Sequence, residues 1–388
     1  MRGINRDILL PAIATIINVV PFAMLTPLVV VRLSETGAPA TMVAAYGMAP
    51  FMAILAVSPF TSRLLSGLGL YKAQLAGLTF AAFGLIATAR LLAIGSELLI
   101  VYLVLAFLLG SASALTWTST EALIASRTQA DRLGQATALY QTGLGVAFAI
   151  GPFLPVLVSP DAAPVLLMTT GLMAAAITVR LLAPHPDTQP SSLAAPTGLE
   201  WTTLPLYGAI LTAALVGGVF EVGLNSAFPY IALQAGLPSS AAVALVGAIA
   251  IGALAAQPPV GWLADSGRTK AATGASLASI LLGVCALGVA VRFPELMWVA
   301  AFLIGAGGGA LYTLAMIQVA RSRERSPVAA LTSLAVAAYT LGAVVGPFAA
   351  GLVIDIAGLL ALCAGLILLP VLVFATNLSR IHQTEREL

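Results

Sequence analysis

Long apolar stretches alternate along the whole chain with short segments that carry charge, proline and glycine. A bilayer core about 30 Å thick needs roughly 20 apolar residues per helical crossing. In lipid, only helices and closed barrels satisfy the backbone polar groups. Barrel strands alternate apolar and polar positions over about 10 residues, and the runs here are longer and do not alternate. The pattern predicts twelve helical spans. They cover residues 8–31, 39–61, 72–93, 97–125, 133–158, 162–183, 203–234, 239–262, 270–291, 295–320, 328–354 and 359–378.

Composition and charge placement support this all-α integral membrane fold. Hydrophobic residues make up 60% of the chain and charged residues 8%, whereas a soluble domain carries about 25% charge. With the N-terminus inside, only Arg32, Arg90 and Arg292 of the 17 basic residues fall in outer segments. The positive-inside rule therefore predicts twelve spans with both termini cytoplasmic. The basic residues act as topology signals, so no nucleic-acid partner is expected.

The two halves of the chain repeat one another at a shift of 195 residues. VLAFLLG at 104–110 matches VAAFLIG at 299–305, and the sequence GPF occurs at both 151–153 and 346–348. This register predicts two pseudo-symmetric six-helix bundles, 1–184 and 203–388, joined by a cytoplasmic linker at 185–202 that is rich in Pro, Ser and Thr. Two bundles related in this way suit alternating access, with the substrate near the midplane.

Two short motifs accompany the repeat. GWLADSGRTK at 261–270 places Asp265, Arg268 and Lys270 around a glycine turn between two spans, where these charges can pair at helix ends. LGAVVGPFAAG at 341–351 is a helix-packing motif of small residues and proline. The packing residues singled out in the two halves are Gly151, Pro152, Gly342, Gly346 and Pro347.

Together with the twelve spans, these motifs resemble the major facilitator superfamily. A finer resemblance is to its bacterial YcaD-like branch, and three segments carry it. They are FEVGLNSAFPYIALQAGL from 220, AAQPPVGWLAD at 255–265 and TEALIASRTQADRLGQATALY at 120–140. The resemblance implies the major facilitator fold, a monomer, a multi-pass location in the bacterial plasma (inner) membrane, and a central cavity lined in part by the fourth and seventh spans. It does not define a substrate, because the branch is poorly defined in this respect.

The chain departs from the family pattern at two places. In the first half, SRLLSGLGLYK at 62–72 has Ser66 where the family acid should stand. In the fourth span, Ala106 occupies the position of the family's arginine, which is often tied to proton handling in drug antiporters. The second departure puts a standard antiport mechanism in doubt, though not transport itself.

Two of the 15 acidic residues, Glu121 and Glu221, lie inside predicted spans. A charge at the bilayer centre costs at least about 2.5–3.5 kcal/mol, so such residues face water or a partner. Glu221 shares a helical face with Gly217, Asn225 and Phe228, and no basic residue is predicted at that depth. We expect Glu221 to bind and release a proton, with a structural hydrogen bond as the alternative. Glu121 lies close to Arg127 and is either a second proton-coupling acid or half of a structural ion pair.

Softer candidates share one property, a polar or aromatic side chain within a span. The expected substrate-cavity residues are Asn18, Trp117, Gln141, Phe220, Asn225, Gln257 and Tyr312. Helix–helix hydrogen bonding is the alternative role for the polar members. Asp355, at the outer end of the eleventh span, is expected to cap or pair there. Cys285 and Cys363 suit neither a disulfide nor a metal site, and no cofactor is expected.

An acid-bearing cavity without a deep arginine favours a hydrophobic or cationic solute over a phosphate-like anion, which needs cationic groups. The sequence therefore predicts a secondary transporter that exports a small hydrophobic or cationic compound in exchange for protons. The alternative is proton-coupled symport or facilitated uptake of a neutral metabolite. A membrane enzyme or lipid-handling protein is disfavoured, because no metal-ligand cluster, nucleophile elbow or phosphate loop is present.

Overall fold

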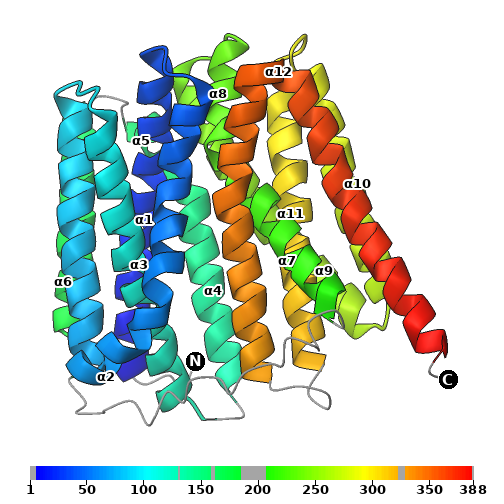
Figure 1. Cartoon of the computed structure of the whole chain (residues 1–388). Helices are drawn as coiled ribbons and strands as arrows, with labels where there is room; N and C mark the ends of the chain where they lie inside the picture. Colours follow the sequence, from blue (N-terminus) through cyan, green and yellow to red (C-terminus); the bar gives the residue numbers. More distant parts are fainter. Residues whose placement is uncertain (1–5, 130–131, 159–161, 185–206, 322–327, 387–388) are drawn as a thin grey trace. The chain divides into compact units, whose positions relative to one another are not determined.

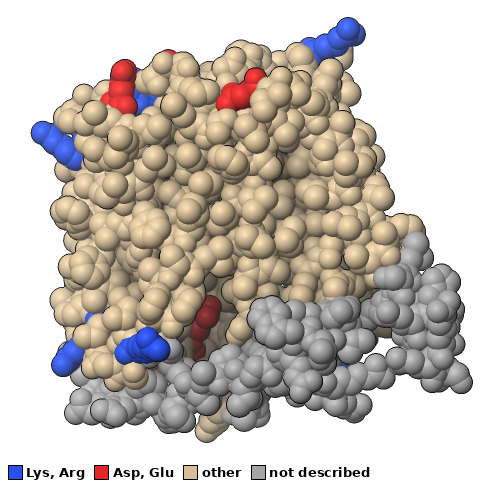
Figure 2. All heavy atoms as spheres, viewed as in Figure 1, with Lys and Arg blue, Asp and Glu red and all other residues tan. Residues whose placement is uncertain are grey.

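The regular structure of the chain is entirely helical in the residues that the structure describes. The computed structural model describes residues 6–129, 132–158, 162–184, 207–321 and 328–386, and Figure 1 shows its helices. The predicted linker at 185–202 lies outside these residues. Within them, eleven helices are long and apolar enough to cross a membrane, judged by length and composition. On the face in Figure 2, described charged side chains gather toward the ends of the helices, and most of the surface between them is uncharged.

Two glycines form sharp corners in place of the loops expected at residues 62–71 and 355–358. Helix α2 (Ala40–Ala93) breaks at Gly69, with φ 76° and ψ 156°, and α12 (Val328–Arg386) breaks at Gly358, with φ 79° and ψ −179°. Glycine adopts such positive φ angles without the steric cost that other residues meet. The helices predicted on both sides of each corner are therefore found, and the connection between them is tighter than the predicted gap. In Figure 1, the orange first half of α12 turns back into its red second half.

The break in α12 bears on the number of spans. The segment Leu331–Asn377 is one candidate of 47 residues, which as a straight helix would reach about 70 Å, more than twice the bilayer core. Two spans joined at Gly358 fit the bilayer, whereas one straight span does not. The count of twelve and the cytoplasmic location of the termini stay predictions.

The chain forms two compact units. Unit 1 comprises Met1–Gly37 and Ala49–Leu193, and unit 2 comprises Ala38–Met48 and Ala194–Leu388. The expected bundles at 1–184 and 203–388 stay predictions, and the first turns of α2 belong to unit 2 rather than unit 1. Within the described residues, α2 is the only helix that the two units share.

Asp355 holds the first turn of α2 within unit 2. Its carboxylate accepts hydrogen bonds from the backbone N–H groups of Ala40 and Thr41, both at 2.8 Å, and from the Thr41 hydroxyl. A carboxylate at this position satisfies N–H groups that the first turn of a helix leaves without partners. The expectation that Asp355 caps or pairs at this end is confirmed.

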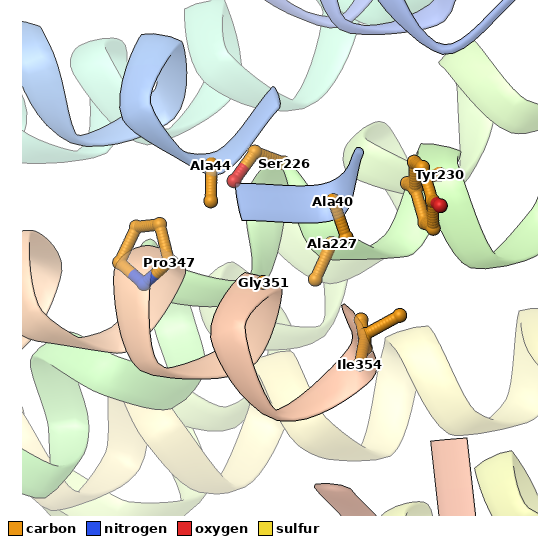
Figure 3. A pocket seen from close by; sticks show the side chains of 8 residues that line it. All are labelled: Ala40, Ala44, Ser226, Ala227, Tyr230, Pro347, Gly351 and Ile354. Carbon is orange, nitrogen blue, oxygen red and sulfur yellow. The ribbon is translucent and has the colours of Figure 1, made fainter. Parts of the chain in front are cut away.

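A hollow with a cavity volume of about 10 Å³ lies between these turns and the rest of unit 2 (Figure 3). The lining residues are Ala40, Ala44, Ser226, Ala227, Tyr230, Pro347, Gly351 and Ile354. Ligand pockets usually measure about 300–1,000 Å³, so we interpret this hollow as a packing space rather than a substrate site.

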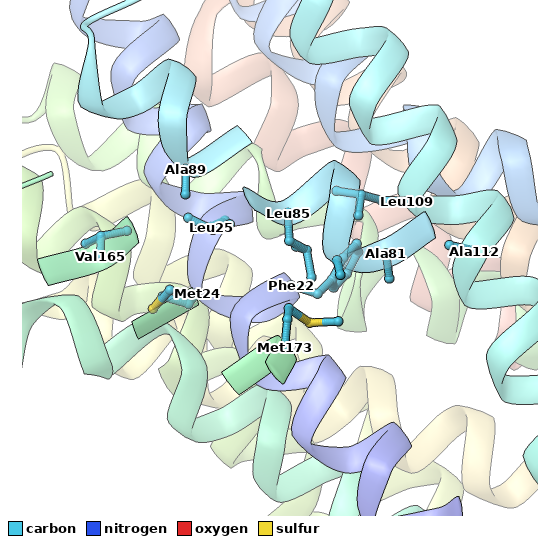
Figure 4. Close-up of a cluster of buried hydrophobic side chains, with 11 residues drawn as sticks. Phe22, Met24, Leu25, Ala81, Leu85, Ala89, Leu109, Ala112, Val165 and Met173 are labelled. Carbon is cyan, nitrogen blue, oxygen red and sulfur yellow. The ribbon is translucent and has the colours of Figure 1, made fainter. Parts of the chain in front are cut away.

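Unit 1 further contains α1 (Arg6–Glu35), α3 (Leu99–Arg127), α4 (Leu133–Ile150), η1 (Gly151–Phe153), α5 (Leu154–Val158) and α6 (Ala162–Leu181). A hydrophobic cluster joins α1, the second half of α2, α3 and α6 (Figure 4). Phe22 and Met24 of α1, Leu85 of α2, Leu109 of α3 and Met173 of α6 are all buried in it. This cluster packs four helices against one another.

Unit 2 further contains α7 (Gly208–Glu221), η3 (Gly223–Asn225), α8 (Ala227–Gln234), α9 (Ser239–Asp265), α10 (Thr269–Val289) and α11 (Leu296–Arg321). Helix α7 packs against both α11 and α12, and α11 packs against α9 and α10. In Figure 1, the green α7 lies beside α11 and the orange half of α12. Helix α7 therefore has protein on at least two sides, and its residues define the site described next.

Candidate functional site

The seventh predicted span is interrupted immediately after Glu221. Glu221 is the last residue of α7, Val222 leaves the helical region with φ −123° and ψ −39°, and helical structure resumes as α8 only at Ala227. The prediction of one continuous helix over 203–234 is wrong. The spacing that predicted a shared face for Gly217, Glu221, Asn225 and Phe228 does not extend across the break, because the regular 3.6-residue repeat ends at the acid.

This break places Glu221 at the C-terminal end of a helix. The aligned peptide dipoles give such an end about half a negative charge. A carboxylate there adds like charge to like charge, so the position favours either a bound proton or a nearby cation. Interrupted spans of this kind also place helix-end carbonyls where transporters coordinate cations.

Tyr339 of α12 and Tyr312 of α11 lie beside the acid. The Tyr339 hydroxyl donates a hydrogen bond to Oε2 of Glu221 at 3.1 Å. The Tyr312 and Tyr339 rings contact each other, with centroids 4.3 Å apart and ring planes at 41°. All three residues are half-buried, so each retains accessible surface. One carboxyl group and two aromatic rings from three helices thus form a single cluster, which we call the Glu221 cluster.

Glycines on all three helices fix the positions of these side chains. A Cβ atom on Gly218 of α7 would overlap the Tyr339 carbonyl, and one on Gly308 of α11 would lie 2.7 Å from the Glu221 backbone nitrogen. A Cβ atom on Gly217 would lie 3.1 Å from the Tyr312 nitrogen. Small residues allow such close approach of helices in membranes. The helix backbones that carry the cluster are therefore so closely packed that they leave little room for a side chain at these glycines.

No basic side chain forms an ion pair with Glu221 among the described residues. The described basic side chains of unit 2 are Arg268, Lys270, Arg292 and Arg321, and all lie at or beyond the ends of α9, α10 and α11. Within the described part of unit 2, the charge of an ionised Glu221 is left without a protein counter-ion.

The other predicted cavity residues of unit 2 lie in different surroundings. Phe220 is completely buried, and its Cβ lies 3.0 Å from the position of a Cβ on Gly308. Asn225 ends η3, and its side-chain oxygen is buried without a hydrogen-bond partner. Gln257 is half-buried in α9. Of the predicted set, the structure brings Tyr312 into the Glu221 cluster and gives Phe220 the surroundings of a packing residue.

The motif loop between α9 and α10 turns at Gly267, with φ 74°. Asp265 lies 3.6 Å from the Arg321 guanidinium, which also donates hydrogen bonds to the Ala264 carbonyl at 2.9 Å and the Thr269 hydroxyl at 3.2 Å. Arg268 and Lys270 are exposed. The partner found for Asp265 is therefore at the end of α11, outside the sequence motif.

In unit 1, the Gln141 side chain of α4 donates a hydrogen bond to the Glu121 carboxyl group of α3. The alternative ion pair of Glu121 with Arg127 is not found among the described residues, where Arg127 lies 4.0 Å from Asp7. Glu121 and Gln141 are exposed within the described structure. Two residues predicted separately thus form one polar pair.

Asn18 and Trp117 lie deeper in the same unit. Asn18 of α1 is 3% exposed, and its side-chain oxygen has no hydrogen-bond partner. Trp117 precedes Glu121 by one helical turn and meets Phe148 edge-on, with centroids 6.5 Å apart. The indole N–H of Trp117 is also buried without a partner. These unsatisfied groups are hydrogen-bonding capacity that a solute or water can use.

Sequence reasoning missed Gln74, Arg321 and Tyr339. The Gln74 side chain is completely buried, and its amide nitrogen lies within hydrogen-bond distance of the Pro11 carbonyl at 3.0 Å, the Thr15 hydroxyl at 3.0 Å and the Thr120 hydroxyl at 2.7 Å. The available signal was a polar side chain in an apolar span for Gln74 and Tyr339, and a basic residue in the last turn for Arg321. Their partners lie on other helices. The signal could therefore identify these residues as candidates but could not predict their hydrogen-bond partners.

The packing motif residues approach neighbouring helices closely. A Cβ on Gly151 would lie 2.7 Å from the Ala23 side chain, and one on Gly346 would lie 3.2 Å from the Gly223 Cα. A Cβ on Gly342 would overlap the Leu215 carbonyl. Pro152 is buried in η1, and Pro347 lies inside α12. This geometry suits the predicted packing role.

Comparison with known proteins identifies relatives over nearly the whole chain. The family model described as Major Facilitator Superfamily matches residues 12–220 and 209–387. The MFS-type transporter YfkF of Bacillus subtilis is 24% identical over 335 residues, covering 84% of this chain and 83% of YfkF. The MFS-type transporter YcaD of Salmonella dublin is 25% identical over 355 residues, covering 89% of this chain and 88% of YcaD. The resemblance to the YcaD-like branch is confirmed.

A solved structure shares the fold. The crystal structure of the nucleoside transporter NupG aligns with a TM-score of 0.71 and 13% identity, covering 97% of this chain and 99% of NupG. The crystal structure of a point mutant of NupG aligns with a TM-score of 0.73 and 12% identity. At this identity the likeness speaks for the fold alone.

Proposed function

Because the chain belongs to the Major Facilitator Superfamily and its relatives are MFS-type transporters, we propose that it is a proton-coupled exporter of small hydrophobic or cationic compounds. It works as a monomer in the bacterial inner membrane, by alternating access, and exchanges protons against its substrate. Glu221 is the proton-carrying group. The chain itself is a multi-pass membrane transporter and not an enzyme.

The observation that carries this proposal is a carboxyl group at an interrupted span with no basic partner among the described residues. An uncompensated charge in a low-dielectric setting is costly, so the group stays neutral unless a cation approaches. Binding of a proton in one state and its release in another gives the coupling that secondary transport needs. Tyr339 donates to the same carboxyl group and holds it in one orientation.

Glu121 is the second proton-coupling candidate and lies in the other unit. Its hydrogen bond with Gln141 supports a polar site on α3 and α4. Asn18 and Trp117 add buried polar atoms without partners to the same unit. We propose that this group of residues contributes substrate contacts, with proton exchange centred on Glu221.

The alternative is proton-coupled symport or facilitated uptake of a neutral metabolite. The same fold and the same acid serve either direction. The fold shared with NupG selects neither a direction nor a substrate. Whether a pH gradient drives the solute out of cells or into them separates the two possibilities.

The test uses the full chain reconstituted in liposomes with an acidic interior and an enclosed pH-sensitive dye. Ethidium, tetraphenylphosphonium and the neutral nucleoside uridine are added outside in turn. We expect a cation to dissipate the gradient with wild type and Glu295→Gln, but not with Glu221→Gln. Glu295 is an exposed acid of the same unit and serves as the matched control. Full pH-driven exchange by Glu221→Gln would falsify the role of this residue.

A further inference from the structure

We infer that the Glu221 cluster is a recognition site for an organic cation, in which the cation takes the place of the proton on Glu221. This inference rests on the proposed function and narrows its substrate class. Three features of unit 2 carry it: the charge balance at Glu221, the helix end on which it lies, and the two tyrosine rings beside it.

Charge balance links the mode of coupling to the charge of the substrate. Tyr312 and Tyr339 are the titratable residues in contact with Glu221 or with each other, and the described basic residues of unit 2 lie at helix ends. When the proton leaves Glu221, one negative charge remains without a protein counter-ion. A bound monovalent cation restores neutrality, whereas a neutral solute does not. Exchange at this carboxyl group therefore requires a substrate that carries positive charge.

The end of α7 adds to this preference. Glu221 is the last helical residue, and the partial negative charge of a helix C-terminus adds to that of the carboxylate. Both attract a cation and neither offers a donor to an anion. An interrupted span thus creates an electronegative point within an apolar unit.

The tyrosines favour an organic cation over a metal ion. Aromatic faces attract ammonium-type cations through the ring quadrupole, by about 0.5–2 kcal/mol depending on exposure. Tyr312 and Tyr339 are half-buried, and the close glycine contacts at Gly217 and Gly218 fix the positions of their backbones. Among the described residues, no group of three or more His, Cys, Asp or Glu could hold a metal ion. One carboxylate with two rings suits an ammonium or phosphonium group with apolar substituents.

The experiment measures binding and proton release with the purified full chain in detergent, using tetraphenylphosphonium and the uncharged triphenylphosphine oxide as probes. We expect wild type to bind the cation and release about one proton per cation bound, with no release on addition of the oxide. Tyr312→Leu should weaken cation binding about 2- to 30-fold, the range of one cation–π contact. Tyr312→Phe, which keeps the ring, should bind like wild type. Tyr230→Leu is the matched control, because Tyr230 lines the separate hollow of Figure 3.

Three outcomes overturn the inference: no cation binding by wild type, equal affinity for the two probes, or unchanged cation binding by Tyr312→Leu. Its failure is distinguishable from failure of the proposed function. If a neutral solute collapses the pH gradient in liposomes through Glu221, the transporter stays proton-coupled and only the cation site is wrong. If Glu221→Gln liposomes match wild type, the proposed function itself falls.

Discussion

The two units share a set of close glycine contacts between helices, but the acidic residues within their spans lie on different helices. Gly110 of α3 meets the carbonyl of Pro50 in unit 1, and Gly305 of α11, 195 residues later, meets the carbonyl of Ile249 in unit 2. In both, a Cβ would overlap that oxygen. Gly151 packs against α1 and Gly346 against the end of α7 and η3 in a similar correspondence. The repeat therefore preserves contacts that permit no side chain.

The acids do not follow this correspondence. In unit 2 the acid ends a broken helix and contacts a tyrosine, whereas in unit 1 α1 runs unbroken from Arg6 to Glu35 and the acid lies on α3 beside Gln141. The residue 195 positions after Glu121 is Met316. The glycine contacts are thus shared by the two units, whereas the acids and their partners differ between them.

The largest loss of stability is expected when a side chain is introduced at the glycine contacts that the two units share. Gly110→Ala and Gly305→Ala should each destabilise the protein by about 1–3 kcal/mol, because overpacking forces two helix backbones apart. The measurement is thermal unfolding of the purified protein in detergent. Gly171→Ala and Gly274→Ala are matched controls, since a Cβ at either position meets nothing within 4 Å. These controls should unfold at or above the wild-type temperature, because alanine favours helix by up to about 1 kcal/mol. A large loss at one repeated glycine only would show that the two contacts are not equivalent.

A smaller effect is expected where α2 is held to unit 2. Asp355→Ala removes three hydrogen bonds from the first turn of α2 and should cost about 1 kcal/mol, the usual value of a helix cap. Hydrogen exchange of the Ala40 and Thr41 amides should accelerate in this variant. Glu97→Ala is the control in unit 1, because its exposed contact with Arg32 at 3.4 Å caps no helix. Unchanged exchange at Ala40 and Thr41 would contradict the capping role.

The smallest effect is expected in the loop between α9 and α10, where unit 2 alone retains the family's loop motif. A double-mutant cycle of Asp265→Ala and Arg321→Ala should give a coupling of about 0.2–1 kcal/mol, as for other exposed pairs. The coupling should weaken with added salt. Ser66→Ala tests the corresponding segment of unit 1, where the Ser66 hydroxyl donates a hydrogen bond to the nearby Arg63 carbonyl at 2.9 Å, and should leave stability unchanged. A salt-independent coupling would mean that Asp265 and Arg321 interact through packing rather than charge.

The sequence predicts those parts of this molecule that depend on local pattern. Apolar run length locates the spans, and the shared Gly-Pro-Phe locates residues that approach neighbouring helices. The break after Glu221 was not predictable in this way, because no proline lies between Val222 and Ser226 and Gly223 alone does not end a helix. Gly223 instead approaches Gly346 of α12, a contact between residues over a hundred positions apart.

The sequence predicted several residues of the candidate site but not the contacts between them. Glu221, Tyr312 and Tyr339 all stand out as polar groups in apolar spans, but the sequence does not indicate that Tyr339 bonds the acid. Phe220 was expected at the cavity and is fully buried, because rotation of α7 depends on its glycine contacts with α11 and α12. Side-chain direction on a helix is set by such tertiary packing, which periodicity alone does not contain.

Helix α2 has a mechanical consequence of its own. Its first turns belong to unit 2 and the remainder to unit 1, and the boundary falls between Met48 and Ala49, one residue before Pro50. A proline inside a helix removes one backbone hydrogen bond, which makes its surroundings the most easily bent part of the rod. Any displacement of one unit against the other must therefore flex α2 at this joint or pull its tip away from Asp355. The residues around Pro50 and the Asp355 contact are thus the two points of α2 that such a displacement would change first.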